Sequence, residues 1–300
     1  MELRQLKYFV KAAETLNFSE AAKALFITQS TLSQQIRQLE VEMDTQLFQR
    51  NSHEVILTET GENLLTYARR TLLEAEACVN RIHDLQKVLT GTLNIGVTFT
   101  FSPILTETLI DFMKRYPKVK LNIYYKSMVE LLDMLSRHEI DFVLAFKPAI
   151  INKDIESHVL FNNHLAAIVH PNHPLAACPK ISLKDLEQYD LALPAKGMQA
   201  RNEFDKIQSI YHGDFKIRIE LNEVNILLKL VKQSNLVTVL SEATIHNEEG
   251  IHAVPLDITG NDMEGCIHLL KNSYRKHSAQ AFIRMLCDSN AVRARINDWL

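Results

Sequence analysis

The stretch from Ser19 to Glu40 constrains the fold of this chain more than any other segment. It predicts two short helices joined by a tight turn, with Ser19 as the N-cap of the first helix and Thr28 as the N-cap of a second that begins at Gln29. The second helix carries apolar residues at steps of 4, 3 and 4, which form one buried stripe: Leu32, Ile36, Leu39 and Met43. The spacing therefore predicts a helix-turn-helix.

The opposite face of this second helix is polar but nearly uncharged. A solvated helix face more often carries Glu and Lys, whereas Ser, Gln and Arg side chains hydrogen-bond base edges and phosphates in the major groove of DNA. We therefore predict a DNA-binding surface made of Thr28, Gln29, Ser30, Thr31, Ser33, Gln34 and Arg37. The alternative is an ordinary helical hairpin whose outer face meets only solvent.

Short segments on either side extend this unit. Residues 1–15 predict a preceding helix, and residues 47–58 predict two short extended pieces around a turn, the pattern of a wing. Arg50 and His53 belong to that turn and are placed to touch a phosphate or the adjacent minor groove. For His53 the alternative is a solvated hairpin tip.

The net charge of this unit is unfavourable for DNA binding. Residues 1–60 contain six Lys and Arg and eight Asp and Glu, which gives 6 − 8 = −2. Since non-specific DNA affinity comes from neutralised phosphates, one such unit alone is a poor electrostatic match for a duplex. We expect the few cations to share one face, two units to act together, and the affinity to depend only modestly on salt.

Residues 59–90 predict one long helix, because neither Pro nor Gly occurs between Glu62 and Thr90. Its apolar residues follow alternating steps of 3 and 4, a register broken only at Gln86. Such a seam is typical of a dimerising coiled coil. The predicted dimerisation residues are Leu65, Ala68, Leu72, Ala75, Val79 and Ile82. The alternative is a helix laid on its own domain.

From Gly91 onward strands alternate with helices, which predicts an α/β region with parallel sheets covered on both faces. In such sheets ligands bind beyond the carboxyl ends of the strands, where helices begin. Residues 98–102 and 126–128 place hydroxyls directly before a helix. The free N–H groups of a helix start favour an anion or a polar small molecule. Plain N-capping is an equally good explanation for the serines.

Several motifs in the first 61 residues together resemble the LysR-type transcriptional regulators. The matching segments, in order and spacing, are Leu3–Phe9, Asn17–Ala22, Leu39–Glu40, Leu47–Arg50 and Leu57–Gly61. The resemblance is looser beyond them but extends over all 300 residues. It implies an α/β chain with a winged helix-turn-helix DNA-binding domain at 1–58, a linker helix for dimerisation at 59–90 and an effector-binding domain at 91–300. It further implies two Rossmann-like subdomains of periplasmic-binding-protein type, I at 91–160 and 267–300, and II at 161–266.

The same resemblance implies a sequence-specific transcriptional regulator. A small-molecule effector in the cleft between the subdomains is expected to modulate DNA binding or bending. The effector-binding residues that we predict are Thr98, Thr100, Phe101, Ser102, Lys126, Ser127, Phe146, Lys147, Arg201 and Thr238. Phe101 is expected either in an apolar wall of the cleft or in the core. For Arg201 the alternative is a surface ion pair.

The expected assembly is a homodimer that forms a homotetramer, with duplex DNA, the effector and RNA polymerase as partners. The sequence lacks an apolar run of about 18 residues and a secretory signal region, so we expect a cytoplasmic protein without a membrane partner. The four cysteines include no CxxC pair, and the histidines at 164, 170 and 173 lack metal-ligand spacing. We expect free thiols, no metal and no cofactor.

Two other functional classes are the alternatives, a solute-binding protein and an enzyme of the α/β region. The first is disfavoured by residues 1–90 and by the missing signal region. The second would require a phosphate-binding glycine loop, a metal triad or a Gly-x-Ser-x-Gly elbow, and the sequence contains none of these. We therefore predict no enzymatic activity.

Overall fold

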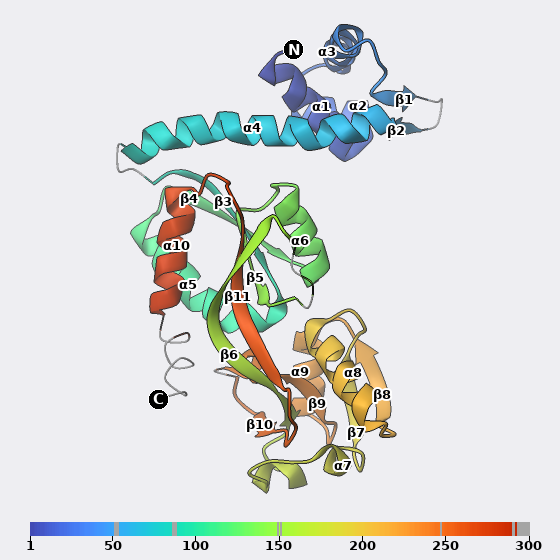
Figure 1. The fold of residues 1–300 in the computed structure, drawn as a ribbon, viewed down its shortest axis with the longest axis vertical. Coiled ribbons are helices and arrows are strands. Elements are labelled where there is room, and N and C mark those ends of the chain that lie inside the picture. The colour runs from blue at the N-terminus through green and yellow to red at the C-terminus, as the bar shows by residue number, and fades with distance from the viewer. Residues whose placement is uncertain are drawn as a thin grey trace. The chain divides into compact units, whose positions relative to one another are not determined.

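The computed structural model describes residues 1–50, 54–85, 89–148, 150, 152–246, 248–289 and 292. They form two compact units, Met1–Val88 and Leu89–Leu300 (Figure 1). We call the first unit the head and the second the C-terminal unit. None of the described helices combines the length and the apolar character that a membrane span requires.

In its described residues the head consists of four helices and a small antiparallel sheet. In chain order these are α1 (Leu3–Thr15), α2 (Phe18–Ala24), α3 (Gln29–Glu42), β1 (Phe48–Arg50), β2 (Val55–Leu57) and α4 (Glu59–Leu85). The ring of Phe48 lies at the centre of the core, with its centroid 5.6 Å from that of Phe9 and 5.3 Å from that of Phe18. The strands pair with Phe48 opposite Leu57, so the wing is tied to this core. The winged helix-turn-helix and the long helix are confirmed.

The N-cap of α3 is the predicted residue, but the N-cap of α2 is not. Thr28 caps α3 as predicted, because its Oγ1 accepts a hydrogen bond from the Thr31 N–H at 3.2 Å. The cap of α2, however, is Asn17, whose side-chain oxygen accepts from the N–H groups of Ser19 and Glu20. The prediction of Ser19 as the cap was wrong. Ser19 and Asn17 are both good caps, and only the path of the chain between α1 and α2 selects Asn17.

The predicted dimer seam on α4 divides into two parts. Ala68 is 1% exposed and belongs to the head core, and Leu65 and Leu72 pack against that core. Ala75 is half-buried, while Val79 and Ile82 are 54% and 58% exposed. The prediction of one continuous intermolecular seam was wrong for its first part, because α1 lies alongside α4 and covers it.

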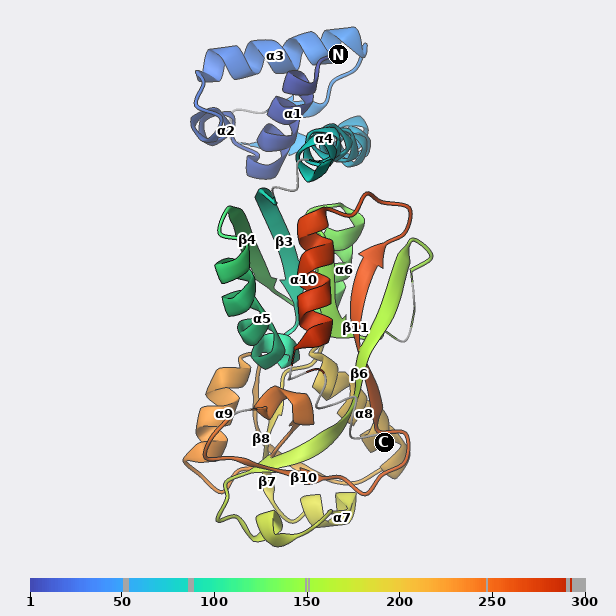
Figure 2. The same cartoon turned by 90° about the vertical axis from the view of Figure 1, so that its left-hand side faces the viewer.

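The C-terminal unit begins with a lobe built on one sheet. Its elements are β3 (Gly91–Val97), η1 (Phe99–Phe101), α5 (Ser102–Arg115), β4 (Val119–Tyr125), α6 (Met128–Ser136), β5 (Phe142–Phe146) and α10 (His277–Asp288). Helices α5 and α10 cover one face of the sheet and α6 covers the other (Figures 1 and 2). Alternate residues of β5 serve the two faces. Leu144 belongs to the cluster that includes Phe112 and Phe282, and Val143 belongs to the cluster under α6.

The second lobe holds the middle of the chain. Its elements are η2 (Pro174–Ala177), α7 (Leu183–Leu186), β7 (Asp190–Pro194), α8 (Gln199–Tyr211), β8 (Lys216–Leu221), α9 (Val224–Lys232), β9 (Thr238–Ser241), η3 (Glu242–Ile245) and β10 (His252–Pro255). Strands β7 and β8 pair in parallel, and a bridge between Leu191 and Val237 links them to β9. Buried Leu and Val side chains of β7 and β9 join the main core, and the Ile side chains of β8 pack against it.

Two long strands, β6 (Ile155–Val169) and β11 (Asp262–Leu270), run from one lobe into the other (Figures 1 and 2). β11 pairs antiparallel with both β5 and β6, with an irregularity between Gly265 and Cys266. In the second lobe β6 pairs antiparallel with β9 and β10. The expectation of purely parallel sheets was therefore wrong. The alternation of strands and helices predicts parallel pairing only within one lobe, and a strand that crosses between lobes enters the sheet in the opposite direction.

Candidate DNA-binding surface and ligand cleft

The polar face of α3 is exposed as predicted. Leu32, Ile36 and Leu39 are completely buried on the inner side of this helix. On the outer side the candidate residues Thr28, Gln29, Ser30, Thr31, Gln34 and Arg37 are exposed, and Ser33 is half-buried. Burial of the apolar stripe thus determines which side chains of α3 remain accessible to a partner. Arg50 lies on β1, but its side chain is outside what the structure describes, and His53 is outside the described residues altogether.

Hydrogen bonds among short side chains fix the start of α3. The Thr28 hydroxyl lies 2.9 Å from the Ser30 hydroxyl and 2.8 Å from that of Thr31. The Ser19 hydroxyl donates to the Gln29 amide oxygen at 2.9 Å, which links α2 to α3. Among the described residues, Ser33, Gln34 and Arg37 have no such partner. The first turn is preorganised, and the next turns leave donors and acceptors free.

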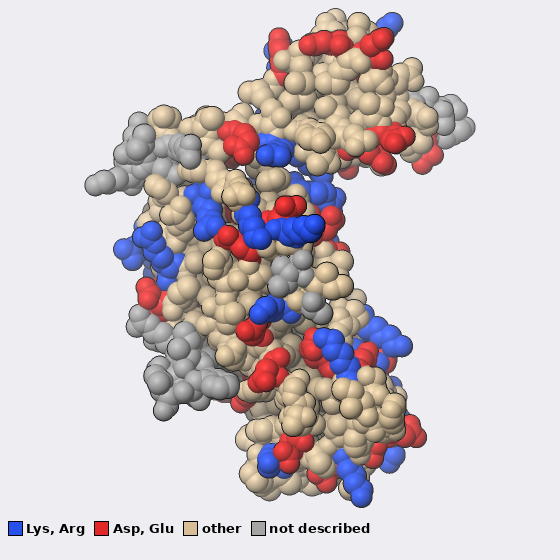
Figure 3. Space-filling model, in the orientation of Figure 1, with Lys and Arg blue, Asp and Glu red and all other residues tan. Residues whose placement is uncertain are grey.

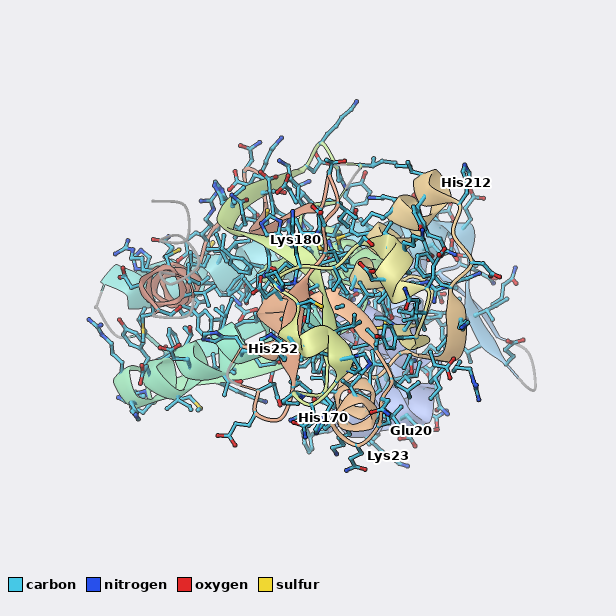
Figure 4. The ribbon with its side chains drawn as sticks, turned by 90° about the horizontal axis from the view of Figure 1, so that it is seen from below. Glu20, Lys23, His170, Lys180, His212 and His252 are labelled. Carbon is cyan, nitrogen blue, oxygen red and sulfur yellow. The ribbon has the colours of Figure 1, made fainter. Side chains whose placement is uncertain are left out.

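The head carries few cations near this surface. Lys23 on α2 pairs with Glu20 at 2.8 Å, and the hydrogen bond to that carboxylate raises the pKa of Lys23 (Figure 4). Figure 3 shows acidic side chains on the visible face of the head and fewer basic ones. Arg37 on α3 has no ion-pair partner among the described residues. Neutral hydrogen-bonding groups therefore dominate the exposed surface.

The turn between α2 and α3 contains Phe26 in the left-handed backbone region, with φ of 56°. The Ile27 N–H donates to the Ala22 carbonyl at 3.0 Å and the Phe26 N–H donates to the Lys23 carbonyl at 3.1 Å, the pair of bonds that defines a Schellman motif. Gly or Asn usually occupies this position, because left-handed backbone costs a residue with a Cβ about 1–2 kcal/mol. The Phe26 side chain is 96% exposed.

The C-terminal unit contains a cleft of about 1420 Å³ between its lobes. The first lobe contributes the segments after β3 and β4 together with one side of α5. The second lobe contributes the segment between β7 and α8, the start of α9, and η3 with the residues that follow it. Five of the predicted effector residues line this cleft: Thr98, Thr100, Ser102, Lys126 and Ser127. These are the hydroxyl and lysine side chains that the sequence places before helices.

The other five predicted effector residues lie elsewhere. Phe101 is completely buried, with its ring packed on those of Phe146 and Phe161 at 5.7 and 5.4 Å. Phe146 and Lys147 line a separate hollow of about 470 Å³, and there Lys147 pairs with Glu264. Phe99, Thr100 and Ser102 line the cleft, and Phe101 between them turns into the core.

Arg201 and Thr238 belong to the interior of the second lobe. Arg201 is 4% exposed, pairs with Asp205 at 2.6 Å and with Glu220 at 2.7 Å, and donates to the Pro194 carbonyl at 3.1 Å. All these partners lie in the second lobe, so Arg201 braces α8 against β7 and β8. Thr238 is completely buried on β9 and does not line the cleft.

Several polar groups that sequence reasoning missed line the cleft. Tyr125, the last residue of β4, accepts a hydrogen bond from the Ser102 hydroxyl at 3.2 Å. Glu130 on α6 completes a capping box with Ser127, accepting from its hydroxyl at 2.7 Å and its N–H at 3.1 Å. These bonds, followed by one from Lys126, lower the pKa of Glu130. The spacing Ser127-x-x-Glu130 is a capping-box pattern, so this contact was detectable in the sequence.

The charges of the cleft are mostly acidic, and half of them form ion pairs. Among its described lining residues four are glutamates and two are lysines. Glu223 accepts from the Asn225 N–H at 3.0 Å at the start of α9, and Glu248 pairs with Lys232 at 2.8 Å. Glu107 and Lys196 have no ion-pair partner among the described residues. The chain's own carboxylates therefore occupy the starts of two helices that face the cleft, α6 and α9, whereas the starts of α5 and α8 carry no acidic residue in the first turn.

Two hydrogen bonds connect the lobes next to the cleft. The Thr244 hydroxyl on η3 donates to the Thr100 hydroxyl at 3.4 Å. The Phe146 N–H at the end of β5 donates to the side-chain oxygen of Gln199, the first residue of α8, at 3.2 Å. Gln199 lines both the cleft and the smaller hollow beside Phe146. The angle between the lobes is thus coupled to groups that a bound ligand would contact.

The thiols and the carboxylates supply no metal-binding cluster within the described part of the chain. Cys266 is completely buried, and this burial, with Glu264 nearby, raises its pKa to about 11. Because the thiolate is the reactive form, the Cys266 thiol is inert at neutral pH. Cys78 on α4 and Cys287 on α10 are exposed free thiols.

Comparisons with known proteins agree with this architecture. Residues 3–62 match the model of the bacterial regulatory helix-turn-helix protein of the lysR family, and residues 86–291 match that of the LysR substrate binding domain. The chain is 30% identical to the RuBisCO operon transcriptional regulator of Allochromatium vinosum over 87% of this chain and 86% of that protein. It is 27% identical to the transcriptional regulator BsdA of Bacillus subtilis over 94% and 99%.

Solved structures show the same fold. Full-length OxyR from Pseudomonas aeruginosa has a TM-score of 0.74 at 23% identity, covering 98% of this chain and 95% of that chain. Full-length CbnR in complex with its target DNA has a TM-score of 0.65 at 21% identity, covering 95% and 99%.

The chain belongs to the LysR family of helix-turn-helix transcriptional regulators. It is a DNA-binding regulator that combines an N-terminal winged helix-turn-helix with a two-lobed effector-binding domain. This confirms the fold class and the general function predicted from the sequence.

Proposed function

We propose that α3 reads the operator through the side chains that its buried stripe turns outward. Gln29, Ser30 and Thr31 meet base edges or phosphates from the first turn, and Ser33, Gln34 and Arg37 do so further along the helix. The absence of competing partners for Gln34 and Arg37 within the described residues supports this assignment. The N-terminal part of a recognition helix is the part that contacts bases. Arg50 and His53 remain candidates for a wing contact.

We propose that the exposed part of α4 pairs two heads. This part of α4 carries apolar residues at steps of 4 and 3, namely Ala75, Val79 and Ile82. They lie beyond the part of α4 that packs on the head core. A two-fold pairing presents two recognition helices, so the operator should contain inverted half-sites. Two dimers then form a tetramer, and RNA polymerase contacts the assembly on the promoter. In this proposal the domain boundaries stay at 58/59 and 90/91, with β6 and β11 crossing between subdomains near residues 160 and 266.

We propose that the effector is a polar small molecule bound between the lobes by Thr98, Thr100, Ser102, Lys126 and Ser127. Any anionic group of the effector should bind at the starts of α5 and α8, which carry no acidic residue in the first turn, and not at those of α6 and α9, where Glu130 and Glu223 lie. The ligand acts by shifting the population of lobe closure angles, which changes how dimers pack and how the heads are spaced. The chain acts by binding and not by catalysis.

The observation that carries this proposal is the exposed, nearly uncharged face of α3 in a chain of the LysR family. The test is a footprint on the DNA upstream of the chain's own gene, together with a thermal-shift screen of metabolites. A ligand at 100 times its Kd should add about 2.7 kcal/mol to the free energy of unfolding. The hit should then alter the footprint. Absence of any footprint would refute DNA reading at that site, and identical footprints with and without the hit would refute the coupling.

A further inference from the structure

The turn of the helix-turn-helix presents a side chain that the fold itself does not explain. Single exposed apolar residues are ordinary on protein surfaces. Phe26 is unusual because it combines almost complete exposure with left-handed backbone, which disfavours any residue with a Cβ. Its ring packs against none of the aromatic rings or core clusters of the described residues. Folding of the head would be served better by Gly or Asn.

A second apolar residue in the same backbone conformation shows the difference. Leu16 ends α1 with φ of 47°, but its side chain is only 45% exposed, so it recovers part of the backbone cost by burial. The other left-handed residues with a Cβ are Asp, His and Asn, which adopt this conformation more readily. Phe26 alone among the described residues combines an apolar aromatic side chain with this backbone.

The position of Phe26 indicates what it contacts. It lies two residues before Thr28, the cap of α3, and two residues of chain span at most about 7 Å. In helix-turn-helix proteins the start of the recognition helix lies among the base edges of the major groove. The Schellman hydrogen bonds hold the turn against α2, so its direction is fixed before DNA arrives. A ring at this place reaches the edge of the groove occupied by the first turn of α3.

The chemistry of the head favours an apolar contact there. The head has a net charge of −2 over residues 1–60, and Lys23 beside the turn is already paired with Glu20. Such a surface obtains little affinity from phosphates and depends more on contacts with the bases. The apolar group that a duplex displays in its major groove is the thymine methyl, and phenylalanine is one of the residues that contact it.

We propose that Phe26 is a specificity-determining residue that packs against a thymine methyl group at the edge of each operator half-site. It adds an apolar contact to the hydrogen bonds made by α3. A contact with DNA would account for both the left-handed backbone and the exposure of the ring.

The test uses the full chain and the duplex that the wild type protects upstream of its own gene. Phe26→Asn should weaken binding to this duplex by roughly ten- to hundredfold, since a dimer loses two contacts. The same variant should raise the thermal midpoint of the head by about 2–6 °C, because Asn tolerates left-handed backbone. Phe26→Tyr keeps the ring and should bind within about threefold of the wild type. A merely structural role would move stability and affinity in the same direction.

Replacement of thymine by deoxyuridine, one position at a time, locates the contact. One such replacement per half-site should weaken wild-type binding and leave Phe26→Asn unaffected. Leu16→Asn makes the same backbone change at the other left-handed apolar residue and should bind as the wild type does.

Wild-type affinity in Phe26→Asn, an equal loss in Leu16→Asn, or the absence of any deoxyuridine position that depends on Phe26 would overturn the proposal. If transcription in vitro falls while DNA binding is unchanged, Phe26 contacts a protein instead, and the proposal also fails. Failure of the wild type to bind at all would count against the operator and not against Phe26.

Discussion

The outer face of α3 and the cleft of the C-terminal unit are both polar surfaces, but they differ in where their side chains already have partners. On α3, Gln34 and Arg37 have no partner among the described residues and are free to bind another molecule. In the cleft, Ser102 is bonded to Tyr125, and Lys126 and Ser127 are bonded to Glu130. Beyond its first turn α3 offers open hydrogen-bonding capacity, whereas the cleft offers a preformed network around Ser102 and Ser127.

This difference follows from what each surface must do. A groove-reading helix exchanges its hydration for contacts with bases, so side chains without a partner in the protein, such as Gln34 and Arg37, can make such contacts without first breaking a bond. In a cleft whose closure depends on a ligand, the side chains should already be hydrogen-bonded within the protein. A ligand that replaces one of these hydrogen bonds then changes the relative populations of the closure angles. The interlobe bonds of Thr100 and Gln199 lie beside the same network.

The largest expected effect is the loss of stability on replacing Arg201, which tests whether this residue holds the second lobe together or contacts the ligand. Arg201→Met removes a buried charge that holds Asp205 and Glu220, and should lower the free energy of unfolding by about 2–3 kcal/mol. The Asp205 and Glu220 side chains are 39% and 40% exposed, so water can solvate them once Arg201 is gone. The expected loss of stability is therefore smaller than for a fully buried ion pair. Urea unfolding measures the loss. Unchanged stability together with a lost thermal shift by the effector would restore Arg201 to the ligand site.

Arg37→Ala tests the open surface. It should weaken operator binding by about 1–3 kcal/mol without changing the free energy of unfolding, since Arg37 packs on nothing that the core requires. Gel shifts at several salt concentrations measure both the loss and its slope. Arg37→Lys is the matched control, because a phosphate contact tolerates lysine and a bidentate base contact does not. A steep salt dependence in the wild type would contradict the nearly neutral surface described above.

Gln199→Ala tests whether the network couples the lobes. The variant removes the acceptor of the Phe146 N–H and should weaken the contact between the lobes by about 1 kcal/mol. Hydrogen exchange of the Phe146 amide should then speed up by roughly fivefold, the equivalent of that energy. Gln188→Ala, a change of the same residue type in the turn after α7, should leave this amide protected. Equal exchange in both variants would show that the bond carries no coupling.

Ser127→Ala is expected to give the smallest effect. Two hydrogen bonds from Ser127 lower the pKa of Glu130, and the variant should raise that pKa toward the ordinary value of a glutamate. These bonds favour the ionised carboxylate, so their contribution to stability is present above the ordinary pKa and is lost as pH falls through the lowered one. NMR titration of Glu130 measures the shift. Lys126→Met should raise the pKa less, and a larger rise there would reverse the order of the two causes.

Local patterns predicted much of the head and only part of the cleft. The steps between Leu32, Ile36 and Leu39 predicted the inner side of α3, because the period of a helix depends on the backbone alone. The hydroxyls before α5 and α6 were placed correctly at the cleft. Phe101 lies in the core, one of the two places expected for it, and the sequence alone did not choose between them. For α4 the periodicity was correct, but a stripe does not reveal whether α1 or a second chain covers it.

The sequence by itself determined the helix-turn-helix, the long helix, the α/β class and the family, because all of these depend on spacing along the chain or on motifs within it. Tertiary structure alone decided that Arg201 is a brace, that the first half of the α4 seam is internal, and that β6 and β11 cross between lobes against the parallel strands. These features depend on which distant residues meet, as Arg201 meets Glu220 and Ala68 meets the core of the head. A buried charge or a covered stripe is defined by its neighbours, and the neighbours come from other elements of the fold.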